Sequence, residues 1–446
     1  MQNLLNAVEK HKQLILDAER YIWANPETGY KEVKTSKYLE DKFIELGYDI
    51  VRADGITGFY TVLDTGIPGP EILVLGELDS IICPSHPEAD KQTGAVHSCG
   101  HNAQCAALLG IAAALKEPNA LDGMCGKIKL CAVPAEELLE IEYRTELMKK
   151  GVIKFYGGKP EFLSRGYFNT TDIAFMVHTN TADIFKVLTN GAIGCLAKRI
   201  IYKGVAAHAG GSPHRGKNAF YAATCGINAC NALRETFEEK DLIRFHPIMT
   251  HGGAMVNAIP EKAEIETYIR SNSFEGMLKI NKRINQALVG AALSLDNNIE
   301  IIDKPGYAPL KNDVNMIELI KDAFEKVFPD QHFEVSEKIN TGSTDMGDLS
   351  AVMPVVHPYA PGAKGTGHGN DYYIVDPIKA CVESAKWQVG MLYLLLKDNA
   401  ERAKKIISEF KPLFKNKEEY FEYLSSIECE GDRITYTNDG TATVKL

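Results

Sequence analysis

The segment EILVLGELDS, residues 71–80, sets the architecture of the first part of the chain. Its centre, Ile72-Leu73-Val74-Leu75, is an uninterrupted apolar run, which is typical of a strand buried on both faces of a parallel sheet. Similar runs follow at residues 130–133 (LCAV) and 173–177 (IAFMV), with helical or loop segments between them. This alternation predicts an α/β domain with a mixed, largely parallel sheet flanked by helices.

Polar residues stand directly after each of these three runs. Glu77 and Asp79 follow the first, Glu136 and Glu137 the second, and His178 the third. In open α/β sheets, ligands bind outside the carboxyl ends of the strands. A polar residue after one strand is as readily explained by the strand's solvated end. Three such ends in succession, all with metal-compatible residue types, favour a shared crevice.

Two helices are expected before the first strand, and a different pattern begins near Gly194. The early helices are an apolar stripe from Leu5 to Ile22, ended by Asn25-Pro26, and residues 35–46. The later pattern is a strand at 196–202, a helix at 220–237, a strand pair flanking Gly252-Gly253, a helix at 277–295 and a strand at 299–302. This β-α-β-β-α-β order is ferredoxin-like.

The change of pattern predicts two domains. Residues 192–303 are expected to form an inserted α+β domain, and residues 1–191 and 304–446 one discontinuous first domain that resumes through TGSTDMGD. A chain of 446 residues also exceeds what one hydrophobic core usually supports. The charged tail after Asn399 has no assigned role.

Composition excludes several classes of protein. The net charge of -10 argues against a nucleic-acid partner, because such proteins usually carry a basic face. The N-terminus lacks a basic region followed by an apolar stretch, and no later apolar run approaches membrane-spanning length. We therefore expect a cytoplasmic protein with no membrane partner. The ten cysteines form no CxxC pair and are expected to be reduced.

The sharpest local signal is HSCGHN, residues 97–102. Cys99 and His101 are two residues apart, so both can point to one side of an extended loop, and Gly100 permits a tight turn between them. A thiolate and an imidazole suit zinc or another late divalent ion. The alternative for this pair is a buried cysteine beside a hydrogen-bonded histidine.

The other candidate residues are weaker when each is considered alone. Glu136 and Glu137 are adjacent, so one carboxylate can bind metal while the other faces the substrate as a general base, but they can also be a solvated acidic helix start. His178 can be a core histidine. His368 lies in a glycine-rich loop without a local partner. A metal site must draw its ligands from several segments, and these segments supply a thiolate, carboxylates and imidazoles.

The combination of motifs resembles a known family of two-metal amidohydrolases. The motifs occur in the family's order: HSCGHN, PAEE, FMVHT, KGVAAHAGGSPHRGKNA, GGAMVNAIPEKAEIETYIRS and STDMGD. The family includes aminoacylase, hippurate hydrolase, auxin-conjugate hydrolases, aminobenzoyl-glutamate hydrolase and a β-alanyl-lysine dipeptidase. The similarity runs from about Glu19 to Asp376.

The resemblance assigns roles to matched residues. It implies that two divalent ions, Zn²⁺ or Mn²⁺, are bound by Cys99, His101, Glu137, His178 and His368, with the cysteine sulfur shared. Glu136 would be the general base and acid. The inserted domain would be a lid that also forms a homodimer, and His208, Asn257 and Arg270 within it would contact the substrate or its developing oxyanion.

The chain departs from the commonest pattern of the family at two positions. Most hippurate and auxin-conjugate hydrolases have CGHD and a further histidine, whereas this chain has Asn102 and Gln104. Asn102 is expected to hold a ligand histidine with less polarisation than an aspartate, and Asp79 is expected beside the ligands. Together with STDMGD, this departure places the chain nearer the aminobenzoyl-glutamate and β-alanyl-lysine branches.

The expected function is hydrolysis of the amide bond of a small N-acyl amino acid or dipeptide by a metal-activated water. Glu136 would take the proton of that water and return it to the leaving amine. Two alternatives remain open: an exopeptidase acting on longer peptides, and a homologue that binds metal or a small molecule without turnover.

Overall fold

The computed structural model describes residues 1–439 and 441–446, which form two compact units. The first unit contains Met1–Gly191, Leu310–Asn340 and Thr344–Lys417. The second contains Ala192–Pro309, Thr341–Ser343 and Glu418–Leu446. The division expected from the sequence left residues 304–309 and the whole tail with the first domain. In the structure these six residues and the end of the tail group with the second unit.

The first unit is built on a six-stranded sheet in the order β1-β2-β6-β3-β7-β16. The strands are Val51–Arg52, Phe59–Asp64, Lys127–Val133, Glu71–Glu77, Ile173–Phe175 and Val355–Val356. β1 and β2 are antiparallel to their neighbours, whereas β6, β3, β7 and β16 are parallel. Every residue of β3 is buried, as its apolar run predicts. The expected α/β fold class is confirmed.

Smaller sheets extend this unit. A four-stranded sheet has the order β15-β9-β17-β8, formed by Phe333–Ser336, Phe185–Leu188, Tyr359–Ala360 and His178–Thr179. Two short hairpins pair β4 (Ile81–Ile82) with β5 (Ala95–Val96) and β18 (Ala363–Lys364) with β19 (Tyr373–Ile374). The apolar run at 173–177 is therefore not one strand. It ends at Phe175, and His178 begins β8, which pairs with β17 in the other sheet.

Helices surround the main sheet of the first unit. They are α1 Gln2–Lys10, α2 Lys12–Trp23, α3 Val33–Glu45, α4 His101–Leu115, α5 Ile141–Lys149, α6 Gly158–Ser164, α9 Val314–Val327, α10 Met346–Ser350, α11 Ser384–Leu396 and α12 Glu401–Glu409. The N-terminal stripe expected as one helix is two, because His11 leaves the helical conformation and its ring contacts Glu117. All residues of α4 are buried, and its small side chains allow close packing against α2, β3 and α11.

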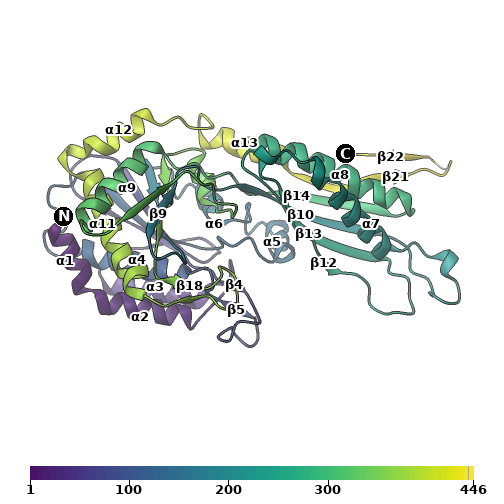
Figure 1. The fold of residues 1–446 in the computed structure, drawn as a ribbon, viewed down its shortest axis with the longest axis horizontal. Helices are drawn as coiled ribbons and strands as arrows, with labels where there is room; N and C mark the ends of the chain where they lie inside the picture. The colour runs from purple at the N-terminus through teal and green to yellow at the C-terminus, as the bar shows by residue number, and fades with distance from the viewer. Residues whose placement is uncertain (440) are drawn as a thin grey trace. The chain divides into compact units, whose positions relative to one another are not determined.

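The second unit has the expected ferredoxin-like order. Its elements are β10 Gly194–Lys203, α7 Ala219–Ala232, β11 Arg244–Phe245, β12 Ile248–His251, β13 Lys262–Ser271, α8 Phe274–Ser294 and β14 Asn298–Tyr307. The sheet is antiparallel, with β13 between β10 and the short strands β11 and β12. α7 and α8 lie side by side on it (Figure 1). Alternate residues of β13 are buried, because one face of the sheet packs under these helices.

The C-terminal tail completes this second sheet. After α13 (Lys417–Ile427), β20 (Cys429–Asp432) pairs antiparallel with β14, from Glu300 opposite Asp432 to Asp303 opposite Cys429. β21 (Ile434–Tyr436) and β22 (Ala442–Val444) then form a hairpin. The tail therefore covers the outer edge of β14, which would otherwise expose unpaired backbone groups.

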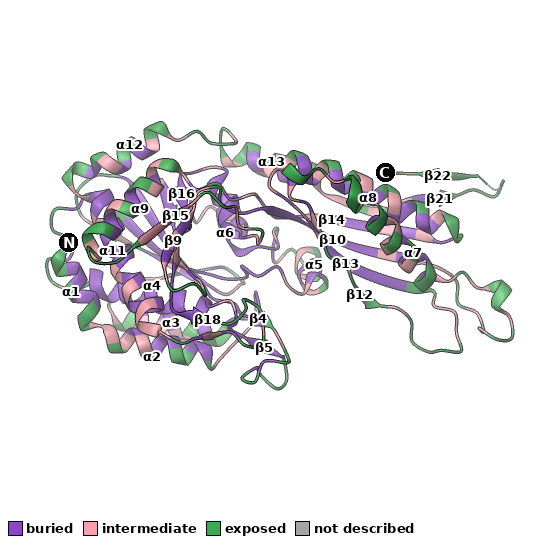
Figure 2. Ribbon diagram, in the orientation of Figure 1, coloured by how far each residue is buried: buried purple, intermediate pink, exposed green. Residues whose placement is uncertain are grey.

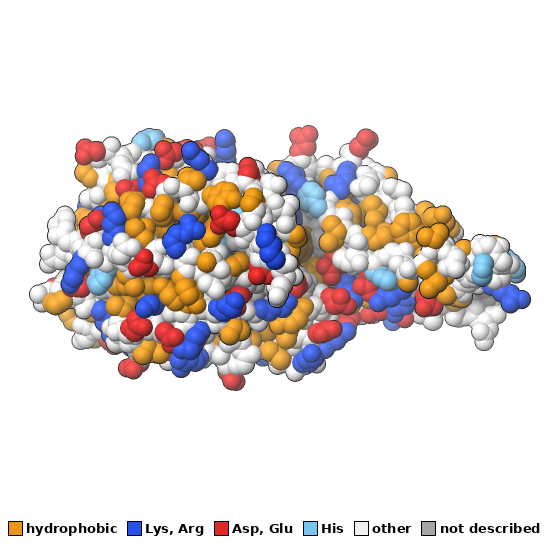
Figure 3. Space-filling model, turned by 90° about the horizontal axis from the view of Figure 1, so that it is seen from below, with side chains coloured by type: hydrophobic (Ala, Val, Ile, Leu, Met, Phe, Trp, Pro, Cys, Tyr) orange, Lys and Arg blue, Asp and Glu red, His pale blue; other side chains and the backbone are white. Residues whose placement is uncertain are grey.

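The burial pattern and the surface agree with a globular protein. In Figure 2 the long central strands and the inner faces of the helices are buried, and green exposed residues lie on outer helix faces, loops and the strands β12, β21 and β22. On the face in Figure 3, acidic and basic side chains intermingle. Among the described helices, none has the combined length and apolar character needed to cross a bilayer.

The packing of the tail predicts unequal effects for two residues that face each other across β21 and β22. Ile434 is 1% exposed and contacts the core of the second unit, whereas its cross-strand partner Val444 is 37% exposed. Ile434→Ala should lower the free energy of unfolding by about 2–5 kcal/mol. Val444→Ala should change it by less than about 0.5 kcal/mol. Urea denaturation measures both, and equal losses would contradict this difference in packing.

Candidate metal centre

The structure brings together the six residues that the sequence placed at a metal site. His101 begins α4 and Cys99 lies two residues before it. Glu136 and Glu137 follow β6, His178 begins β8, and His368 lies in the loop between β18 and β19. Cys99, His101 and His178 offer three ligand atoms within 4.8 Å of one another, and so do Cys99, Glu137 and His368. Cys99 belongs to both groups, so its sulfur lies near the donor atoms of each.

Gly100 makes the Cys99-Gly100-His101 turn possible. It precedes α4 with a φ of 87°, in the left-handed region that favours glycine. A Cβ at this position would lie 2.2 Å from Thr179 Oγ1 and 2.4 Å from the Tyr372 hydroxyl. No other residue type fits, and the turn carries Cys99 and His101 to the same side.

Hydrogen bonds set the tautomers of two histidines. His101 Nδ1 lies 2.9 Å from the carbonyl oxygen of Asp79, and His178 Nδ1 lies 2.7 Å from that of Thr179. Because a carbonyl oxygen only accepts, each Nδ1 donates its proton, and the lone pair of a neutral ring is on Nε2. His178 Nε2 points to Cys99 Sγ at 3.4 Å.

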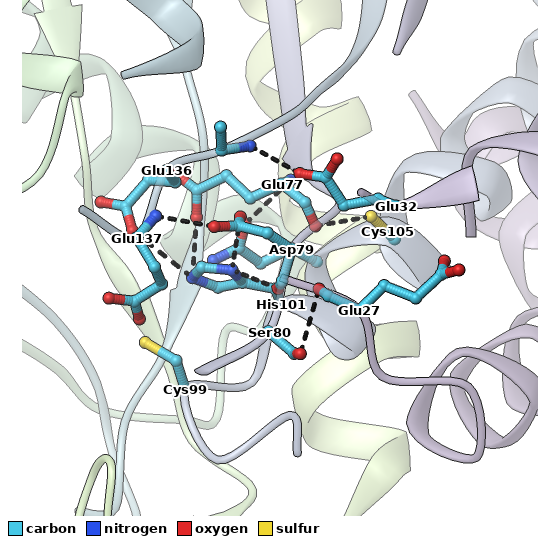
Figure 4. Close-up of polar contacts among 12 residues, drawn as sticks. Glu27, Glu32, Glu77, Asp79, Ser80, Cys99, His101, Cys105, Glu136 and Glu137 are labelled. Atoms are coloured by element: carbon cyan, nitrogen blue, oxygen red, sulfur yellow. Dashed lines mark hydrogen bonds and ion pairs between the residues drawn. The ribbon is translucent and has the colours of Figure 1, made fainter. Parts of the chain in front are cut away.

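Asp79 links the two groups of ligands. One carboxylate oxygen lies 3.3 Å from His101 Nδ1, and the other accepts a hydrogen bond of 2.7 Å from the backbone N–H of Glu137. Glu137 Oε1 lies 2.9 Å from His368 Nε2, and the backbone N–H of His368 donates to Ser98 O at 2.8 Å. Figure 4 shows Asp79 beside His101, with Cys99 and Glu137 on the opposite side of that ring.

The electrostatics favour a thiolate at the centre. Burial and the Glu137 carboxylate oppose ionisation of Cys99, but the nearby histidines outweigh them and lower its pKa to about 6. Burial also opposes ionisation of Glu137, yet His368 and His101 hold its pKa well below the usual range. The pKa of Glu136 is raised well above its usual value, first by burial and then by the charges of Glu77 and Glu137.

These residues fit divalent ions. His101 Nε2 is buried and makes no hydrogen bond with any described residue. The donors are a low-pKa thiol, imidazole nitrogens and a carboxylate, the set that zinc and other late divalent ions prefer. Two groups of donors with a shared sulfur match a two-ion site.

The turn that carries the two glutamates is held by residues that the sequence did not single out. Ala135 has a φ of 56°, and its N–H donates to Glu32 Oε1 at 2.8 Å. The buried Arg144 donates to the carbonyl oxygens of Ala135, Glu137 and Tyr156. Each acts on the backbone of a segment distant in sequence, so a local pattern does not reveal its role.

The remaining predicted residues lie elsewhere. Asn102 donates to Glu19 Oε1 of α2 at 2.8 Å, and the expected hydrogen bond from Asn102 to a ligand histidine is not found among the described residues. In the second unit, His208 and Asn257 are both exposed. They lie on adjacent loops, because the backbone N–H of Ala209 donates to Asn257 O and His208 forms an isolated β-bridge with Ala258. Arg270 is the last residue but one of β13 and donates to Ser343 Oγ at 3.0 Å.

An α/β unit with this donor cluster, together with a ferredoxin-like unit, defines the class of metal-dependent peptidases and amidohydrolases. The model of the peptidase family M20/M25/M40 matches residues 76–393, and the chain belongs to that family. This membership confirms the two-metal amidohydrolase resemblance of the sequence motifs.

Individual relatives are distant. The chain is 27% identical over 302 residues to one component of the p-aminobenzoyl-glutamate hydrolase of Escherichia coli, a match covering 66% of this chain and 58% of that protein. It is 27% identical over 375 residues to the human Xaa-Arg dipeptidase, covering 79% and 78%. A dinuclear metal-binding peptidase of the M20 family from Bacillus subtilis has the same fold, with a TM-score of 0.62 and 17% identity over 87% of this chain and 99% of its own.

The geometry of the turn predicts a sharp contrast between two glycines. Gly100→Ala should lower metal affinity by at least about tenfold, because the turn that presents Cys99 and His101 must shift. It should also cost about 1–2 kcal/mol of stability from backbone strain, in addition to the clash. A Cβ at Gly367, beside His368, meets nothing within 4 Å, so Gly367→Ala is the matched control. Competition with a chromogenic chelator measures affinity. Wild-type affinity in Gly100→Ala would contradict the assignment of this turn.

Proposed function

We propose that this protein is a two-metal hydrolase that cleaves the amide bond of a small N-acyl amino acid or dipeptide. The observation that carries the proposal is the pair of donor groups sharing Cys99, with Glu136 beside them. Glu136 Oε2 lies 3.8 Å from His101 Nε2, whereas Glu137 Oε1 lies 2.9 Å from His368 Nε2. Glu136 is therefore more loosely placed against the donor cluster than Glu137 is. This spacing suits a carboxylate that reaches the site through water.

The chain's own residues account for proton transfer. When bound, the divalent ions would polarise the scissile carbonyl and make water more acidic. With the ions bound, Glu136 starts as a carboxylate, takes the proton of the attacking water and holds it. It then delivers that proton to the nitrogen of the leaving amine. Asp79 keeps His101 oriented throughout.

The relatives support this substrate class. The names p-aminobenzoyl-glutamate hydrolase and Xaa-Arg dipeptidase both denote hydrolysis of an amide bond next to one amino acid. We assign Zn²⁺ or Mn²⁺ as the ions because the donors include sulfur, nitrogen and oxygen. A peptidase acting on longer peptides and a homologue without turnover are the competing assignments.

The deciding experiment is a substrate panel assayed with Zn²⁺, with Mn²⁺ and with a chelator. We expect metal-dependent release of amino acids from N-acyl amino acids or dipeptides. Hydrolysis of long peptides in preference to these would favour the exopeptidase. Absence of any turnover by the metal-loaded protein would favour the binding homologue.

The neighbouring glutamates should behave differently when each is replaced by glutamine. Glu136→Gln should retain both ions and lose about 100-fold to 10,000-fold in kcat with little change in KM, because only proton transfer is removed. Glu137→Gln loses a charged donor, so its metal affinity should fall and excess metal should partly restore activity. Metal analysis and steady-state kinetics separate the two. The roles are reversed if Glu136→Gln is the variant that loses metal.

We further propose that the second unit is a lid and dimerisation domain. Among the described strands, β12 pairs with β13 on one side only, whereas β20 covers the edge of β14. Ile248 on β12 and Met255 and Val256 after it are exposed apolar residues, with Val256 fully exposed. An open strand edge beside exposed apolar side chains is suited to isologous pairing with a second copy.

Dimerisation through the lid predicts complementation between two inactive variants. If His208 acts in the site of the partner subunit, His208→Ala should lower turnover by roughly 100-fold with unchanged metal content. Mixing it with Glu136→Gln should restore roughly a quarter of wild-type activity, because half of the molecules are heterodimers and each has one intact site. Subunits are exchanged in mild denaturant, and light scattering checks the dimer. A monomer, or a mixture with no recovery, would contradict this arrangement.

A further inference from the structure

A buried lysine forms ion pairs with two carboxylates in the interior of the first unit. Lys159, in α6, has no exposed surface, and its Nζ binds Glu77 Oε1 and Asp345 Oδ1. Its backbone N–H also donates to Asp345 Oδ2 at 2.9 Å. Burying these three charges is costly, and apolar residues of similar size would often be as stable. The arrangement is therefore better explained by what it positions than by stability.

The second carboxylate oxygen of Glu77 faces His101, one of the proposed metal ligands. Oε2 lies 3.2 Å from His101 Nε2, is buried, and makes no hydrogen bond with any described residue. Glu77, His101 and Glu136 offer ligand atoms within 4.8 Å of one another, and Figure 4 shows the two glutamates converging on the imidazole. Glu77 itself is fully buried, so it is not placed to contact a substrate.

The tautomer of His101 indicates what this close approach requires. Its Nδ1 donates to Asp79 O, so in a neutral ring the lone pair of Nε2 faces the lone pairs of Glu77 Oε2. Two such acceptors at 3.2 Å repel each other unless a proton on Nε2 or a metal ion lies between them. With metal bonds of about 2.0–2.2 Å, two donors of the same ion lie roughly 3–3.5 Å apart. The observed separation of 3.2 Å lies within the range for two ligands of one ion.

We propose that Glu77 donates a further oxygen to the ion held by His101, and that Lys159 and Asp345 are positioning residues that aim this oxygen. The inference rests on the proposed two-metal function and deepens it. It makes the two ions unequal, because the ion at His101 gains one protein donor that the ion at His368 lacks. The ion with fewer protein ligands retains the open position that a reaction requires.

Glu77→Gln tests the proposal directly. The glutamine can keep an oxygen on Lys159 while turning its NH₂, which does not ligate, toward the ion, so the fold is largely preserved. We expect affinity for one of the two ions to fall at least about tenfold. The visible spectrum of the Co²⁺-substituted protein should change, whereas the urea stability of the metal-free protein should not fall below that of the control variant.

The matched control lies on the same strand. Glu71, at the start of β3, forms a buried ion pair of 2.6 Å with Lys129, roughly 20 Å from Glu77. Glu71→Gln therefore removes a comparable buried charge far from the ions, and it should leave metal affinity and the Co²⁺ spectrum unchanged. Lys159→Met should weaken binding of the same ion as Glu77→Gln does, because the Glu77 carboxylate loses the ion pair that positions it.

The outcomes separate this inference from the proposed function. Two ions bound with wild-type affinity and an unchanged Co²⁺ spectrum in Glu77→Gln would overturn the role of Glu77, and His101 and Glu77 would then be an ion pair with a protonated ring. A wild-type protein that binds fewer than two ions would overturn the two-metal function itself. If Lys159→Met does not fold, Glu77→Gln and Glu71→Gln still decide the question.

Discussion

The cost of burying charge governs this structure. The first unit contains several acids at the bottom of its site that have little or no contact with water, among them Glu77, Asp79, Glu136 and Glu137. Isolated ionised carboxylates cannot be buried, so each must be hydrogen-bonded, paired or neutralised. Lys159 compensates Glu77 and Asp345, backbone N–H groups and histidines compensate Asp79 and Glu137, and Glu136 is driven toward its protonated form. Divalent ions supply the remaining positive charge in the arrangement that we propose.

The fold gathers the donors by joining strand ends that belong to different sheets. Glu77 ends β3 and Glu136 follows β6, so the parallel sheet brings both to one edge. His178 comes from the four-stranded sheet and His368 from a hairpin loop, and His368 is linked to Asp79 through Glu137. Small residues make this convergence possible. The surroundings of Gly100 leave no space for a side chain, and the fully buried helix α4 packs closely behind it.

The second unit solves a different physical problem, that of strand edges. A ferredoxin-like sheet has two edges, and open edges invite pairing with other chains. The C-terminal tail protects one of them through β20, while β12 remains available on the other side. This asymmetry gives the tail a structural role in the second unit.

The sequence by itself determined what depends on local patterns. Apolar runs predicted β3 and β6. The order of the elements from Leu196 to Ile302 predicted the ferredoxin-like unit. The motifs from HSCGHN to STDMGD predicted the family and the six clustered residues. Local patterns did not give the break at His11, the separation of His178 from β7, or the pairing of β20 with β14, because each depends on a partner distant in sequence. The same holds for the roles of Lys159, Arg144 and Glu32, which no local pattern reveals. Their importance arises from low-dielectric contacts with segments up to 186 residues away, and only the tertiary structure creates those contacts.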